Sequence, residues 1–204
     1  MLWDSGLGDN FISHPAPKDH PYHPTVTHSL VSQLKQLGLK PSDITFLAFS
    51  HIHMDHTGNA NLFLDSTWLW QEQEWKHAHT KNAGGVDLKT FDQYEKVKKL
   101  IFSGDYDVFG DGRVKILTTT GHTPGHQCLF IKLKNKPIIL SGDLYHLRAN
   151  RAHKRVPKFN VNRADTLASF DRIEKIAKNM DARIIIQHDA EDFSTLPLSP
   201  KFLE

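Results

Sequence analysis

The hydrophobic positions along this chain follow two spacings, one typical of helices and one typical of strands. Apolar side chains three to four residues apart predict amphipathic helices over residues 25–37, 88–101 and 165–179. A further helix is expected at residues 71–79. Asp165 is the expected N-cap of the last helix, because a short polar side chain there can accept the first unpaired backbone N–H groups.

Short, largely apolar runs predict strands, of which those at residues 44–49 and 183–186 are expected to be buried. These runs are residues 44–49, 67–70, 114–117, 127–133, 137–140 and 183–186. Helices and strands are mixed along the chain, and no repeat or interdomain linker separates them. The pattern therefore predicts one α/β domain that covers residues 1–204.

Composition narrows the class of protein. In 204 residues, 39% are hydrophobic and 24% are charged, as in ordinary soluble globular proteins. Lys and Arg total 25 against 23 for Asp and Glu, so the net charge gives no reason to expect nucleic acid or a membrane as partner. A single cysteine, Cys128, excludes an internal disulfide framework. Without a recognisable signal peptide, the expected location is the cytoplasm.

The 14 histidines direct attention to one loop, His51-Ile52-His53-Met54-Asp55-His56, which follows a predicted strand. Imidazole nitrogens and a carboxylate oxygen suit a divalent ion such as Zn²⁺. If the loop begins as extended chain, His51 and His53 point to the same side and can grip one ion. Asp55 and His56 follow after a turn and can serve a second ion nearby.

The order His-x-His-x-Asp-His after an apolar strand resembles the signature of the metallo-β-lactamase superfamily. Other pieces of that pattern occur in order, each after a predicted strand: His122, Asp143 and His188. Asp4 also resembles the Asp-x-Gly element of this superfamily. The resemblance implies a four-layer αβ/βα sandwich of the metallo-β-lactamase fold. Because Asp4 stands so early, the first N-terminal strands of that fold are expected to be absent.

The resemblance also implies a set of metal ligands. His51, His53 and His122 would bind a first ion, Asp55, His56 and His188 would bind a second ion, and Asp143 would bridge the two. Two divalent ions, with Zn²⁺ the expected metal, would lower the pKa of a shared water and polarise a substrate oxygen. Asp4 is interpreted as a residue that orients a ligand histidine, and His126 as a structural one.

Three features resemble the N-acyl-homoserine lactonase branch of this superfamily, and imply a quorum-quenching lactonase that acts on a small lactone or ester. They are the 66-residue spacing from His56 to His122, the segment 141–146 and the segment 159–163. That group places an aromatic hydrogen-bond donor three residues after the bridging aspartate. Here that position is His146, and Tyr145 precedes it. We favour His146 for polarising the substrate carbonyl and keep Tyr145 as the alternative.

The implied reaction begins when a hydroxide between the two ions attacks the lactone carbonyl, and Asp55 passes a proton to the leaving alkoxide. The catalytic candidates are therefore Asp55, His146 and Tyr145. A glyoxalase II-like thioesterase, or another ester hydrolase of this fold, is the alternative enzyme. A truncated, inactive family member is the non-enzyme alternative. Missing strands would expose a sheet edge, which a homodimer could cover. Trp68, Trp70 and Trp75 are candidates for a dimer surface or for the core.

Overall fold

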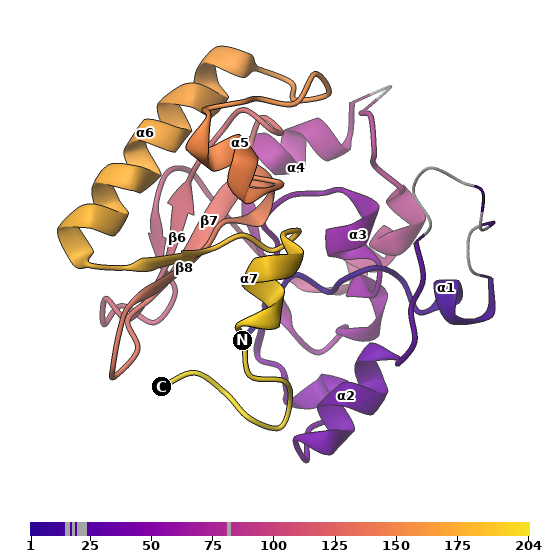
Figure 1. The fold of residues 1–204 in the computed structure, drawn as a ribbon. Coiled ribbons are helices and arrows are strands. Elements are labelled where there is room, and N and C mark those ends of the chain that lie inside the picture. Colours follow the sequence, from indigo (N-terminus) through magenta and orange to yellow (C-terminus); the bar gives the residue numbers. More distant parts are fainter. Residues whose placement is uncertain (15–16, 18, 20–23, 81–82) are drawn as a thin grey trace. The chain divides into compact units, whose positions relative to one another are not determined.

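The computed structural model describes residues 1–14, 17, 19, 24–80 and 83–204 (Figure 1). These residues divide into two compact units. The first consists of residues 1–70 and 78–100, and the second of residues 71–77 and 101–204.

The first unit is built on a sheet with the strand order β1-β2-β3-β4. The strands are β1 (Leu2–Trp3), β2 (Phe46–Ala48), β3 (Thr67–Gln71) and β4 (Lys98–Phe102), and the last residues of β3 and β4 belong to the second unit. β1 pairs with β2 in parallel, and β2 pairs with β3 in parallel. Trp68 and Trp70 are buried in the core, where Phe49 contacts both rings, so they are not a dimer surface.

The helices of the first unit are short. They are α1 (Asn10–Ser13), α2 (Leu30–Gln36) and α3 (Met54–Thr57), with 3-10 turns at Pro41–Asp43, Ala60–Leu62, Leu88–Thr90 and Asp92–Lys96. The expected helix over residues 25–37 begins only at Leu30, because Ser29 caps it by accepting the Ser32 N–H.

The helix predicted over residues 88–101 is wrong. The chain there forms two 3-10 turns and then β4. The side chain of Asn61 replaces the helical hydrogen bonds: its amide donates to the Lys89 carbonyl, and its oxygen accepts the Gln93 N–H. Asp87 likewise accepts the Lys89 N–H. Side chains that bond backbone groups in this way compete with helix formation.

The second unit is built on a sheet with the order β5-β6-β7-β8-β9. Its strands are β5 (Tyr106–Asp107), β6 (Val114–Thr118), β7 (Gln127–Ile131), β8 (Ile138–Leu140) and β9 (Arg183–Ile185). Its helices are α4 (Glu72–Ala78, with Ala78 in the first unit), α5 (Arg148–Ala152), α6 (Arg163–Met180) and α7 (Ala190–Ser194), with a 3-10 turn at Gly142–Leu144.

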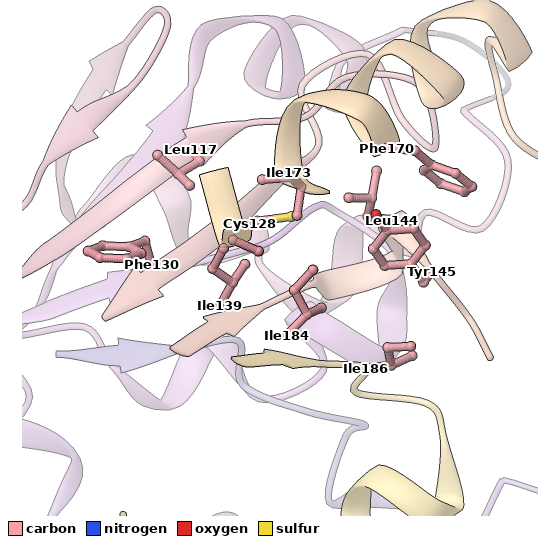
Figure 2. Packing of buried hydrophobic residues seen from close by; sticks show 11 residues of the cluster. Leu117, Cys128, Phe130, Ile139, Leu144, Tyr145, Phe170, Ile173, Ile184 and Ile186 are labelled. Carbon is pink, nitrogen blue, oxygen red and sulfur yellow. The ribbon is translucent and has the colours of Figure 1, made fainter. Parts of the chain in front are cut away.

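Helix α6 packs its apolar face onto this sheet (Figure 1). The N-cap of α6 is Asn162, whose side chain accepts the N–H groups of Ala164 and Asp165, so the prediction of Asp165 as the cap is wrong. Figure 2 shows the resulting core. It consists of Leu117, Cys128, Phe130, Ile139, Leu144, Tyr145, Phe170, Ile173, Ala177, Ile184 and Ile186.

The strand directions decide where the polar loops of each unit gather. β6 and β8 are both antiparallel to β7, and β9 is parallel to β8, so β6, β8 and β9 run the same way. Their carboxyl ends therefore lie at one edge of the sheet, where the chain continues to His122, Asp143 and His188. In the first unit, the parallel pair β1 and β2 likewise delivers Asp4 and the His51–His56 loop to one edge.

Candidate metal centre

The first unit pins the His51–His56 loop to the segment that follows β1. The Ser5 N–H donates to the His56 carbonyl at 2.7 Å, and the Gly58 N–H donates to the Gly6 carbonyl at 2.9 Å. The backbones approach so closely that a Cβ on Gly58 would lie 2.2 Å from the Gly8 nitrogen. The loop is thus held in one conformation by backbone contacts over more than fifty residues of sequence.

Asp4 contacts a histidine of this loop, as its place in the sequence predicted. Its Oδ2 lies 2.9 Å from His56 Nδ1. A carboxylate only accepts, so His56 donates its Nδ1 proton and keeps a lone pair on Nε2. Asp55 Oδ2 lies 3.6 Å from that Nε2 atom. Asp55 and His56 therefore offer one oxygen and one nitrogen side by side.

His51 and His53 form the second pair of donors in this loop. His51 Nε2 lies 2.9 Å from His53 Nδ1. Gly85 rests against the His53 ring with φ +75°, and a Cβ there would lie 2.6 Å from His53 Cδ2. Two imidazole nitrogens that converge in this way are suited to share one divalent cation. Sequence reasoning missed Gly85, because only the fold brings it to the motif.

In the second unit, three histidines surround one carboxylate. Asp143 Oδ2 lies 3.4 Å from His122 Nε2 and 3.1 Å from His146 Nε2. Asp143 Oδ1 lies 3.0 Å from His188 Nε2. Each oxygen of the carboxylate thus faces a different side of the cluster, which is the arrangement that a bridging ligand requires. His146, which follows the same turn, is the histidine that no ligand pattern predicted.

Hydrogen bonds behind this cluster fix its histidines. Asn160 donates its amide to Thr166 Oγ1, so its oxygen faces His122 and accepts from Nδ1 at 3.1 Å. His126 accepts the Asp143 backbone N–H on Nε2 at 3.0 Å and donates from Nδ1 to the Thr119 carbonyl. Both ring nitrogens of His126 are thus used, which agrees with its interpretation as a structural histidine. Asn160 lies in segment 159–163, which resembles the lactonases, but no sequence motif assigned this residue a specific role.

Arg148 holds the segment that carries His188. Its backbone N–H donates to Asp189 Oδ2 at 2.9 Å, and this bond holds the pKa of Asp189 below its usual range. Its guanidinium also bonds Asp192 and Glu191. The turn after Asp143 and the turn after β9 are thereby tied together.

Tyr145, the alternative candidate to His146, lies away from the Asp143 cluster. Its side chain lies in the hydrophobic core beside Leu144 and Phe170 (Figure 2). The hydroxyl donates to Glu174 Oε1 at 3.0 Å, and burial raises the pKa of Tyr145. His146, the next residue, points the other way and contacts the ring of His122. Of the two candidates, only His146 faces the Asp143 cluster.

The family model of the metallo-beta-lactamase superfamily matches residues 1–188. The chain belongs to this superfamily. Metallo-beta-lactamase relatives include the N-acyl homoserine lactonase AttM of Rhizobium radiobacter, 33% identical over 180 residues that cover 84% of this chain and 68% of that protein. The N-acyl homoserine lactonase AiiA of Bacillus thuringiensis subsp. kurstaki is 28% identical over 176 residues, 85% of this chain and 67% of that protein.

A solved structure of a quorum-quenching N-acyl homoserine lactone hydrolase has a TM-score of 0.85 and 26% identity, and the match covers 99% of this chain and 80% of that chain. The predicted metallo-β-lactamase fold and the resemblance to lactonases are therefore confirmed. The superfamily and the donor chemistry of both units indicate divalent metal ions. No described helix is long and apolar enough to cross a membrane.

Proposed function

We propose that this protein is a metal-dependent hydrolase that opens the lactone ring of N-acyl-homoserine lactones and so quenches quorum signals. The observation that carries this proposal is the Asp143 carboxylate with His122, His146 and His188 around it, in a chain whose relatives are named lactonases. Residues 1–204 would act as a single hydrolase domain on a small lactone or ester.

Two divalent ions, with Zn²⁺ the preferred metal for such nitrogen and oxygen donors, are part of the proposal. The residues that would hold them are His51, His53, Asp55, His56, His122, Asp143 and His188. When bound, the ions would supply an activated water and polarise the substrate carbonyl. Asp4 and Asn160 support this because each accepts the Nδ1 proton of its histidine, so that the ring carries its lone pair on Nε2.

The remaining chemistry falls to side chains of this protein. The Nε2 atom of His146 faces Asp143 Oδ2 at 3.1 Å, and its N–H would turn to the carbonyl oxygen and stabilise the charge that develops there. Opening the ring breaks the ester C–O bond and leaves an alkoxide, which is a poor leaving group near neutral pH. Asp55, whose side chain is 40% exposed, would carry the proton to this alkoxide.

A substrate panel tests the proposed function. The Zn²⁺-loaded protein is supplied with N-hexanoyl-homoserine lactone, a glutathione thioester and a simple aryl ester, and proton release is followed at constant pH. We expect the lactone to be hydrolysed with the highest kcat/KM, and the product to carry the mass of one added water. A higher kcat/KM for the thioester would replace this function with a glyoxalase II-like one. A protein inert toward the whole panel would support an inactive family member.

The roles of Tyr145 and His146 give a paired prediction. Tyr145→Phe removes the hydrogen bond to Glu174, so we expect a loss of about 1 kcal/mol in unfolding free energy and an unchanged kcat/KM. His146→Ala removes a donor to the developing oxyanion, so kcat should fall about 10²- to 10³-fold. Urea unfolding and steady-state lactone hydrolysis measure both. A large loss of kcat in Tyr145→Phe, with His146→Ala near wild type, would reverse the assignment.

A further inference from the structure

Ser50 is a buried serine that stands directly before the His51–His56 loop, and its hydroxyl contacts three polar side chains. Its Oγ donates to Asp4 Oδ2 at 2.9 Å. The same oxygen lies 3.0 Å from His51 Nδ1 and 3.0 Å from His56 Nδ1. The Ser50 backbone N–H also donates to the other carboxylate oxygen, Asp4 Oδ1, at 2.6 Å. Asp4 thus binds both the backbone and the side chain of Ser50, and the two histidines contact the same hydroxyl.

The protons in this cluster can be assigned from what each group is able to do. A carboxylate only accepts, and a serine hydroxyl has one proton, which goes to Asp4. The Ser50 oxygen must then accept from His51, so the His51 proton lies on Nδ1. His56 also keeps its proton on Nδ1, because it faces Asp4 and Ser50. One carboxylate and one hydroxyl thus set the same tautomer in two histidines.

We propose that Ser50 is a positioning residue that prepares His51 and His56 together for metal binding. This inference rests on the proposed ligands, in which His51 serves the first ion and His56 the second. With both protons on Nδ1, both Nε2 atoms present lone pairs. Groups behind a ligand histidine fix its tautomer and orientation and raise its basicity, and their loss typically costs 10- to 100-fold in metal affinity.

The proposal makes the two sites depend on one hydroxyl. Ser50→Ala leaves Asp4 bonded to His56 but removes the acceptor for the His51 Nδ1 proton. His51 is then free to carry its proton on Nε2, the atom that should bind metal. The first ion should therefore lose more affinity than the second, and a merely structural role would not produce this difference.

The experiment titrates Zn²⁺ into the metal-free full chain in competition with a chromophoric chelator, and resolves the two binding steps. We expect Ser50→Ala to weaken one step by about 10- to 100-fold and the other by less, and Ser50→Thr to restore much of the affinity. Thr57→Val is the matched control. Thr57 is equally buried and directly follows the same loop, but its hydroxyl bonds the His53 carbonyl and Thr90 Oγ1, so both steps should stay near wild type.

Two further results decide the inference. If Ser50→Ala does not fold, Asp4→Asn tests the same network: the new amide donates to Ser50 Oγ, the serine proton turns to His51 Nδ1, and both steps should weaken. Ser50→Ala or a folded Asp4→Asn that binds two ions as tightly as wild type would overturn the role of Ser50. A wild-type protein that binds fewer than two ions would instead overturn the proposed ligand set.

Discussion

Replacing Asp143 by asparagine is expected to lower kcat/KM for lactone hydrolysis by more than about 10²-fold, the upper range for residues that only support a ligand. Asp143 is nearly buried, with 6% of its side chain exposed, and its two oxygens face His122, His146 and His188. Asparagine keeps the shape but replaces one oxygen with an N–H donor and removes the negative charge. The histidines on one side of the cluster would then face an N–H donor instead of the carboxylate oxygen that accepts from them or binds a metal ion.

The measurement combines lactone kinetics with metal content by elemental analysis. We expect the Asp143→Asn protein to retain fewer than two ions per chain. Asp171→Asn is the matched control, because Asp171 lies in the same unit on α6 and forms an exposed ion pair with Lys154. Exposed pairs contribute about 0–1 kcal/mol, so this variant should keep wild-type rates. Wild-type kinetics and two ions in Asp143→Asn would remove Asp143 from the proposed site.

The ligand pattern could be predicted from the sequence because each piece is local. A buried apolar run predicts a strand, and the residues after it lie at the end of that strand. His122, Asp143 and His188 follow β6, β8 and β9, whose common direction brings them to one edge of the sheet. To predict that these three residues lie together, it was enough to know the strands, which the apolar runs predict, and the strand arrangement, which the family resemblance implies.

The contacts that Ser50 and Asn160 make behind the ligands could not be predicted, because they join residues far apart in the sequence. Ser50 meets Asp4 across 46 residues, and Asn160 meets His122 across 38. The failed helix over residues 88–101 has the same origin. Asn61, about thirty residues earlier, bonds the backbone of that segment and holds it in turns. Apolar spacing carries no information about such side chains.

Tyr145 and His146 show a limit of a different kind. Alternation along an extended chain predicts that two consecutive side chains point in opposite directions. It does not say which one faces the core. In the structure, Tyr145 faces the core, where its hydroxyl donates a hydrogen bond to Glu174. Arg151 on α5 in turn donates to Glu174. The hydrogen bond to Glu174 thus favours Tyr145 on the core side, and His146 takes the side that faces Asp143.

Removing metal from the protein is expected to abolish lactone hydrolysis and to lower the melting temperature by about 10–20 °C. An ion present at about one hundred times its Kd contributes about 2.7 kcal/mol of stability, so two ions contribute about 5 kcal/mol. For a chain of this length, each kcal/mol corresponds to about 2–4 °C. The physical reason is that the His51–His56 loop places ligand nitrogens close together, 2.9 Å apart for His51 and His53, where a bound cation would hold them.

Thermal unfolding and lactone assays with and without a chelator measure this effect, and added Zn²⁺ or Co²⁺ should restore both activity and melting temperature. Asp143→Asn provides the internal control, because a protein that holds less metal should lose less on chelation. An unchanged melting temperature with lost activity would mean that the ions act in catalysis alone and that the loops keep their shape without them. Full activity after complete removal of metal would contradict the proposed chemistry, because the described side chains would then have to activate water unaided.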